Sequence, residues 1–213
     1  MFANFIDGPF WTFSLTVFII GVIWRLVSII RLGIPDDLAV PRENGSSGGM
    51  KAVFSRFLAR PAMRKRAMLI IVAGYMFHVG LFALLFFAQP HIDFYVDRFG
   101  VPAWAGMPRW LFILTAEIAF AGLIMAWLYR VLHPVTRILS GAGENTASWL
   151  VFLVMLTGCL ALLEQYESLR LIHFFLAELL LIYFPFSNLM HTFTFAFSRN
   201  YTGATMGRRG VDA

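Results

Sequence analysis

Five long apolar stretches constrain this chain more than any other feature of its sequence. Each reaches or approaches the roughly 20 residues that a helix needs to cross the hydrocarbon core of a bilayer. The stretches lie at about residues 10–30, 67–89, 110–132, 148–165 and 170–197. Charged residues make up 14% of the chain, against roughly 25% in an ordinary soluble domain. The pattern predicts an all-α integral membrane protein with five transmembrane helices in one domain over residues 1–213, and it excludes a soluble enzyme.

The basic residues predict the orientation of these helices. Thirteen lie in the loop between the first and second stretches, the loop between the third and fourth, and the C-terminal tail, against three on the opposite side. Because positive loops stay on the cytoplasmic side, we expect the N-terminus outside and the C-terminus in the cytoplasm, across the inner membrane. The net charge of +5 then follows from topology and does not indicate nucleic acid.

The loop between the first and second stretches is the largest polar segment. Residues 43–49 are rich in Gly and Ser, which predicts a flexible piece, and residues 53–58 form a short amphipathic stretch before Pro61. Such a stretch is typical of an interfacial helix beside anionic lipid. Docking of a cytosolic partner, chiefly on residues 42–66 and 199–213, is the functional alternative, and the two are compatible.

Histidines inside apolar stretches are costly and therefore suggest function. His78 lies in the second stretch, and His173 and His191 lie 18 residues apart in the fifth. On an unbroken helix this spacing is five turns, so both imidazoles leave one face about 27 Å apart, although Pro185 should kink the helix. Haem iron in membrane cytochromes b takes two axial imidazoles, usually from facing helices. The fifth helix could therefore bind two haems, one near each membrane face.

Depth in the membrane pairs His78 with His191 toward the inner face and His91 with His173 toward the outer face. The second pairing depends on Pro90, because an unbroken helix would rotate the His91 side chain by about 220° from that of His78. A break at Pro90 could restore the direction of His91, or His91 could be only a loop residue. For each of these histidines, a hydrogen-bonded structural role is the alternative.

Other polar residues in the stretches have two interpretations each. Glu117 and Glu178 lie about 10–12 Å from the outer ends of their helices. They could pack helices together as paired groups, or they could accept protons beside a quinol site. Arg25, in the inner half of the first stretch, could bind a haem propionate or extend to the inner interface. We expect His133 to be an interfacial residue and Cys159 a small apolar filler.

Two sequence strings resemble the gamma subunits of respiratory nitrate reductases. Residues 77–81 (FHVGL) resemble a Phe-His-Ile-Gly element of that family. Residues 184–191 (FPFSNLMH), with His173 eighteen residues before the final histidine, resemble its fifth helix. The same superfamily includes membrane cytochromes b of heterodisulfide-reductase-like and sulfite-reduction-associated complexes. The expected topology, five membrane crossings with the N-terminus outside, also resembles that of this family.

The resemblance implies His78 and His191 as ligands of an inner, proximal haem b, and His173 as a ligand of an outer, distal one. The family's second distal ligand falls at Ala88 here, so we expect His91 to replace it; otherwise the distal haem is absent or differently ligated. The implied cofactors are two haems b, and quinone is the implied substrate. The implied partners are a cytosolic iron–sulfur subunit and a catalytic subunit.

The expected function is therefore that of a membrane-anchoring cytochrome b subunit of a respiratory oxidoreductase complex. Such a subunit exchanges electrons between the quinone pool and the iron–sulfur partner through b-type haem. A non-haem membrane anchor and a proton-conducting, transporter-like subunit are the alternatives.

Overall fold

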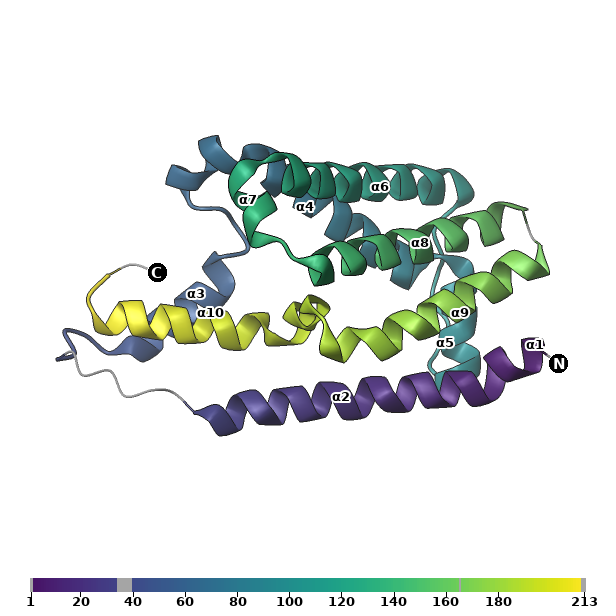
Figure 1. Ribbon diagram of the computed structural model, residues 1–213, viewed down its shortest axis with the longest axis horizontal. Coiled ribbons are helices and arrows are strands. Elements are labelled where there is room, and N and C mark those ends of the chain that lie inside the picture. Colours follow the sequence, from purple (N-terminus) through teal and green to yellow (C-terminus); the bar gives the residue numbers. More distant parts are fainter. Residues whose placement is uncertain (1, 34–39, 165, 212–213) are drawn as a thin grey trace. The chain divides into compact units, whose positions relative to one another are not determined.

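The structure is a computed structural model that describes residues 2–33, 40–164 and 166–211 (Figure 1). Most of these residues fold into helices, and five helical segments are long and apolar enough to cross a membrane. The segments are Phe2–Leu32, Arg64–Phe87, Arg109–Leu132, Ala142–Leu162 and Glu167–Phe186. The prediction of an all-α, multi-pass membrane protein is therefore confirmed. Residue 165 of the expected fourth stretch and residues 212–213 of the tail lie outside the described part.

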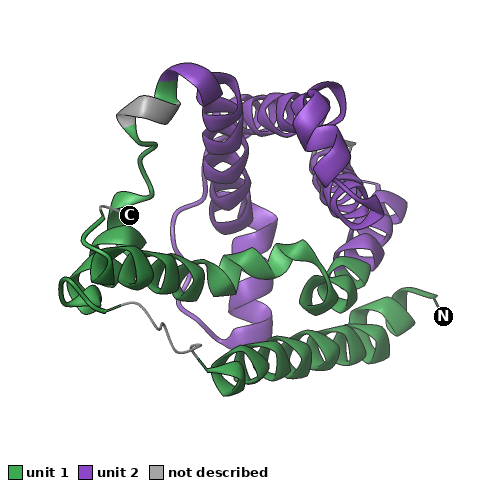
Figure 2. Ribbon diagram, turned by 60° about the vertical axis from the view of Figure 1, so that its left-hand side comes forward, with its two compact units in different colours: residues 1–64, 178–213 green, residues 65–177 purple. Residues whose placement is uncertain are grey.

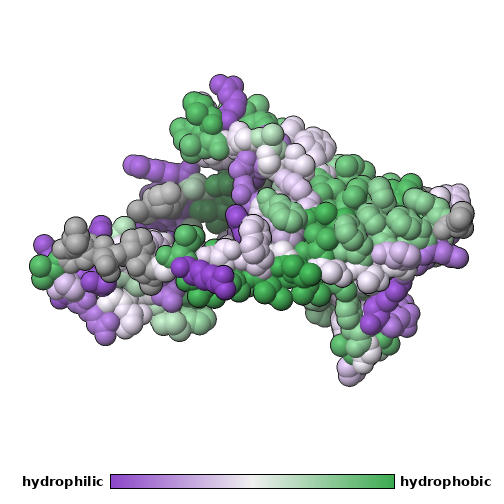
Figure 3. Space-filling model, turned by 60° about the horizontal axis from the view of Figure 1, so that its bottom comes forward, coloured by the Kyte–Doolittle hydropathy of each residue, from purple (hydrophilic) through white to green (hydrophobic). Residues whose placement is uncertain are grey.

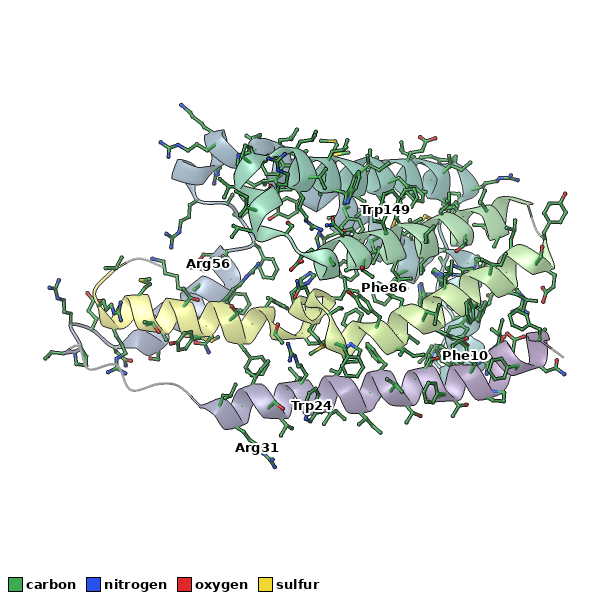
Figure 4. The ribbon with its side chains drawn as sticks, in the orientation of Figure 1. Phe10, Trp24, Arg31, Arg56, Phe86 and Trp149 are labelled. Carbon is green, nitrogen blue, oxygen red and sulfur yellow. The ribbon has the colours of Figure 1, made fainter. Side chains whose placement is uncertain are left out.

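Large apolar side chains cover much of the molecular surface, as a lipid environment requires. Figure 3 shows hydrophobic residues gathered over the face that it views. On the first crossing, exposed side chains include Ile20, Ile23 and Trp24, the last of which is labelled in Figure 4. Exposed apolar patches of this extent are rare on soluble monomers, so these faces are suited to contact lipid tails.

The contacts of the chain group its residues into two compact units (Figure 2), where the sequence showed no internal boundary. The first unit comprises residues 1–64 and 178–213, and the second comprises residues 65–177. The first unit holds α1 (Phe2–Phe5), the π-helix η1 (Ile6–Phe10), α2 (Trp11–Leu32), α3 (Gly45–Ser55), the 3₁₀ turns η2 (Phe184–Phe186) and η3 (Asn188–Met190), and α10 (His191–Arg208). The second holds most of α4 (Pro61–Phe87) and α9 (Glu167–Tyr183), with α5 (Gln89–Phe99), α6 (Arg109–Leu132), α7 (Pro134–Leu139) and α8 (Ala142–Glu164) between them.

The fifth crossing is broken near its C-terminal end. Helix α9 stops at Tyr183, two 3₁₀ turns follow, and α10 begins at His191. Pro185 explains the break, because its ring clashes with the preceding turn and its nitrogen donates no hydrogen bond. The expected kink is confirmed, but the expectation of one continuous helix over 170–197 is wrong. The tighter 3₁₀ turns change the helical phase, so the argument that His173 and His191 share one face five turns apart fails.

A glycine in α2 accommodates this break within the first unit. A Cβ atom added at Gly21 would lie 2.6 Å from Cβ and Cγ of Pro185. One turn earlier, the Phe18 ring contacts the Phe184 ring edge-on, with centroids 5.3 Å apart, and the Phe193 ring at 6.1 Å. The middle of α2 therefore packs on the broken segment and on the first turn of α10.

Residues 45–55 form α3, so the expectation of a flexible Gly/Ser-rich piece is wrong for residues 45–49. Asn44 caps the helix, with its side-chain oxygen accepting a hydrogen bond from the Ser46 backbone N–H at 3.1 Å. A Cβ atom added at Gly48 would lie 2.6 Å from the Gly203 carbonyl oxygen on α10. Glycine is a poor helix former, but its missing side chain lets the two backbones approach, and this packing overrides its propensity.

Close packing through glycine also joins α4 to α6 in the second unit. A Cβ atom added at Gly80 would lie 2.7 Å from the Ala119 Cβ atom. A Cβ atom added at Gly122 would lie 2.5 Å from the Phe77 backbone nitrogen and 2.7 Å from the Ala73 carbonyl oxygen. Small residues at such crossings allow the close backbone contact that drives helix association in membranes.

We expect Gly122→Leu to destabilise the second unit strongly. The new side chain would meet backbone atoms of α4, which cannot rotate away, and overpacking of this kind costs about 1–3 kcal/mol or more. The measurement is the temperature at which the purified protein loses its monodisperse peak in detergent. Gly74→Leu is the matched control, because nothing lies within 4 Å of a Cβ atom at Gly74. Equal midpoints for the two variants would contradict the α4–α6 contact.

Candidate functional site

The junction between α4 and α5 determines the direction of His91. Helix α4 ends at Phe87, Ala88 has extended backbone angles (φ −71°, ψ 128°), and Pro90 stands in the first turn of α5. The break expected at Pro90 is therefore present, at Ala88, two residues earlier. It turns the His91 ring back toward α4, where Nδ1 lies 3.0 Å from the Leu84 carbonyl oxygen. Burial lowers the pKa of His91 below its ordinary value, which favours a neutral ring.

His173 lies in the second turn of α9 and is oriented by α8. Its Nδ1 atom is 3.0 Å from the Val154 carbonyl oxygen. Gly158, one turn further along α8, leaves room for the ring: a Cβ atom there would lie 2.9 Å from His173 Cε1. The hydrogen bond and the missing side chain together hold the imidazole in one orientation against α8.

The structure brings His91 and His173 together. Their ring centroids are 6.0 Å apart and their ring planes are inclined by 26°. Two imidazoles that bind one metal ion from opposite sides have centroids about 6 Å apart, since each metal–nitrogen bond is about 2 Å and each nitrogen is about 1 Å from its centroid. The separation of the two rings thus fits a bis-histidine site.

All four histidines predicted as haem ligands share one hydrogen-bonding pattern. In each, Nδ1 lies within hydrogen-bonding distance of a backbone carbonyl oxygen. The pairs are His78 with Gly74 at 2.7 Å, His91 with Leu84 at 3.0 Å, His173 with Val154 at 3.0 Å, and His191 with Asn188 at 2.7 Å. Since a carbonyl oxygen only accepts, Nδ1 carries the proton, and the Nε2 lone pair of the neutral ring is directed away from that bond. Metal-binding histidines commonly have this arrangement.

The fifth histidine differs from the other four. His133 lies between α6 and α7, and its Nδ1 atom is buried without a hydrogen-bond partner. Its ring stacks on Tyr129, with centroids 5.0 Å apart. Nothing in this arrangement prepares a ring nitrogen for a metal ion.

His78 and His191 belong to different compact units. His78 is exposed in the second half of α4, with its ring 4.8 Å from the ring of Phe77. His191 is the first residue of α10 and is exposed. Arg25 belongs to the same unit as His191 and is exposed on α2. It lies one turn after Gly21, on the helix face that packs on the broken segment.

The two candidate carboxylates have different surroundings. Glu178, in α9, is 1% exposed and is among the most deeply buried side chains of the described residues. Glu117 is exposed on α6, beside the buried stripe that includes Ala116 and Ala119. They belong to different units, and Glu117 shares its unit with the His91–His173 pair.

An apolar groove lies beside the His91 element. It has a volume of about 240 Å³ and is lined by Phe86, Tyr95, Phe99, Val101 and Trp104. Phe86, labelled in Figure 4, accepts a hydrogen bond at its carbonyl oxygen from Trp104 Nε1 at 2.7 Å. The Tyr95 hydroxyl similarly donates to the Leu85 carbonyl at 3.3 Å. Because both polar groups are engaged by backbone oxygens, the groove presents hydrocarbon and aromatic surface.

The donor set fits a haem better than a bare metal ion. Within the described residues, no group of three or more His, Cys, Asp or Glu side chains is placed to hold an ion. A pair of neutral imidazoles suits a cofactor that brings its own equatorial nitrogen ligands, which haem does.

Sequence reasoning missed the groups that orient the two rings. The carbonyl oxygens of Leu84 and Val154 leave no sign in the sequence, because every residue has a backbone carbonyl. Gly158 did leave a signal, as a glycine within the apolar fourth stretch, where small residues indicate close contact. That signal could have placed α8 beside a bulky group.

Comparisons with known proteins find one similar chain of unspecified function. A protein of Nitratidesulfovibrio vulgaris strain Hildenborough, named only "Protein", is 28% identical over 217 residues. The alignment covers 93% of this chain and 91% of that one, so the similarity extends along nearly the whole of both. No family model matches the chain, and no solved structure matches it.

Proposed function

We propose that this protein is the membrane-anchoring cytochrome b subunit of a respiratory oxidoreductase complex. The observation that carries the proposal is the His91–His173 pair, whose rings lie 6.0 Å apart with each Nδ1 bonded to a backbone carbonyl. With Nδ1 protonated, Nε2 is the nitrogen of each ring that could bind iron. The resemblance to nitrate reductase gamma subunits in residues 77–81 and 184–191 supports the same function.

Four histidines hold two haems b in this proposal. His91 and His173 would hold the distal haem through Nε2, and the sequence resemblance assigns His78 and His191 to the proximal haem. When bound, each haem supplies one-electron transfer between its ferric and ferrous forms. Arg25, on the same face of α2 as Gly21, pairs with a propionate of the proximal haem.

Quinol is the proposed electron donor on the side of the distal site. The groove offers apolar surface to a quinone, and α5, which supplies Tyr95 and Phe99 to its lining, also carries His91. Oxidation of a quinol releases two protons for every two electrons, so a carboxylate near the quinol is useful as a general base. Glu178 and Glu117 are the candidates, each accepting a proton at a carboxylate oxygen. Glu117 shares its compact unit with the groove and with His91, whereas Glu178 is the more buried of the two.

Electron transfer out of the membrane requires further subunits. We place the N-terminus outside and the C-terminus in the cytoplasm of a cell with an inner membrane, from the distribution of basic residues. A cytosolic iron–sulfur subunit then exchanges electrons with the proximal site, and a separate catalytic subunit carries out the terminal reaction. Quinone and the bilayer complete the set of partners.

The decisive experiment is a reduced-minus-oxidised visible spectrum of the purified protein, with haem quantified per chain. We expect b-type bands, two haems per chain, and reduction of the haems by a short-chain quinol within seconds. A protein without b-type bands would be a non-haem anchor or a transporter-like subunit, and the proposal would fail. Spectral bands that no quinol reduces would retain the cytochrome and reject quinol as the donor.

A further inference from the structure

Helix α3 buries its small residues and exposes its large apolar ones. Gly45, Gly49 and Ala52 are buried, at positions that share one helix face. Met50 and Phe54 lie on the opposite face and are 57% and 66% exposed. Leu58, just past the helix, is 71% exposed. This distribution is the reverse of that on a soluble amphipathic helix, where large apolar side chains face the core. We call Met50, Phe54 and Leu58 the α3 apolar face.

Contacts with α10 fix the rotation of α3 about its axis. The backbones meet where Gly48 lies against Gly203, with no room for a Cβ atom between them. Arg199 of α10 donates a hydrogen bond to the Val53 carbonyl oxygen at 3.1 Å. The Arg199 guanidinium also lies over the Phe57 ring, 4.5 Å from its centroid. Helix α3 therefore cannot roll to bury the α3 apolar face against α10, and another surface has to cover it.

The charge of the surrounding segment indicates which surface this is. Between residues 40 and 66 the chain carries seven basic residues and one acidic residue, Glu43. Apolar side chains flanked by Lys and Arg are typical of helices that lie in the headgroup region of anionic membranes. The chain also enters a membrane-spanning segment on both sides, at Phe2–Leu32 before α3 and at Arg64–Phe87 after it. This covalent connection keeps α3 close to lipid at all times, whereas a separate protein partner would be close only while bound.

We propose that the α3 apolar face inserts into the anionic headgroup region of the bilayer. The close contact of its small residues with α10 then holds α3 in the orientation in which Met50, Phe54 and Leu58 face the lipid. An iron–sulfur partner would dock on other surfaces of this loop and tail. This assignment is independent of haem binding, because it uses none of the proposed haem ligands.

Spin labels on the full-length protein test the proposal directly. Cys159→Ser removes the only cysteine, and Phe54→Cys then places a single label on the α3 apolar face. Ser55→Cys is the matched control, because Ser55 is the next residue and is also exposed, but about 100° around the helix. The protein is reconstituted in phosphatidylglycerol/phosphatidylcholine vesicles. Collision rates with oxygen, which concentrates in lipid, and with a water-soluble nickel chelate are then compared.

We expect the ratio of oxygen to nickel collisions to be about threefold higher at residue 54 than at residue 55, as for a side chain buried in the acyl–headgroup boundary. Leu58→Cys should behave like Phe54→Cys, which guards against a single misfolded variant. Equal ratios at 54 and 55 in both vesicle-bound variants would overturn the proposal. Protection of residue 54 only in native membranes, and not in lipid vesicles, would also overturn it and assign the face to a protein partner.

Discussion

Replacing His91 or His173 by alanine is expected to remove one and the same b haem. In the proposed site each ring would supply one nitrogen ligand to a shared iron, a role with which their 6.0 Å centroid separation is compatible, so loss of either ring would open the site. Haem content should fall from two per chain to one. His78→Ala and His191→Ala should each remove the other haem. The measurement is a pyridine haemochrome assay together with low-temperature difference spectra that resolve the two α-bands.

His133→Ala is the matched control, because it is the one histidine without a carbonyl partner at Nδ1. It should keep both haems and the wild-type spectrum. Two outcomes would contradict the pairing: loss of different haems from His91→Ala and His173→Ala, or two intact haems in either variant. The first would leave the cytochrome proposal standing with new ligand pairs, and the second would assign these histidines a structural role.

Gly158→Leu is expected to impair the distal site without touching either ligand. A side chain at residue 158 would occupy the space of the His173 ring, since even its Cβ atom would lie 2.9 Å from Cε1. The ring would lose its hydrogen bond to Val154 and its alignment with His91. Loss of such an orienting contact weakens metal binding by about tenfold to a hundredfold. The measurement is retention of the distal haem during purification and dialysis against apomyoglobin.

Gly74→Leu controls for the cost of leucine in a membrane-spanning helix, because a Cβ atom at Gly74 meets nothing within 4 Å. It should retain the distal haem, which is the one compared here, because the Gly74 carbonyl is the partner of His78 and not of His91 or His173. Normal haem retention in Gly158→Leu would show that α8 does not position His173, whatever the ligands are. Loss of both haems in Gly158→Leu, with normal retention in Gly74→Leu, would indicate a general packing defect rather than a local one.

The crossings were predictable because an apolar run of about 20 residues has few alternatives to a membrane helix. The fifth stretch shows where that reasoning stops. Hydropathy continues smoothly through Pro185, whereas backbone geometry does not, so composition predicted a longer helix than the structure contains. Likewise, the glycines of residues 45–49 favour flexibility in isolation, and the packing on the distant segment around Gly203 that favours the helix has no local signal.

The histidine site was predictable in part. Depth along the crossings paired His91 with His173, and Pro90 indicated the break that aims His91. The orientation of each ring was not predictable, because it depends on the backbone carbonyl oxygens of Leu84 and Val154, and the residue type does not show which carbonyl accepts a hydrogen bond. The buried state of Glu178 and the exposed state of Glu117 were also hidden, since hydropathy places both at similar depth but does not report the helix face.

The origins of these two carbonyl oxygens have a consequence for the order in which the protein matures in the membrane. Leu84 precedes His91 by seven residues, so the His91 ring can take its orientation as soon as α4 and α5 have left the ribosome. Val154 belongs to α8, so the His173 ring is oriented only when α8 and α9 stand side by side. A nascent chain that ends at residue 139 therefore presents one prepared imidazole and lacks the other. A cofactor held by both rings would therefore enter only after α8 and α9 are in place.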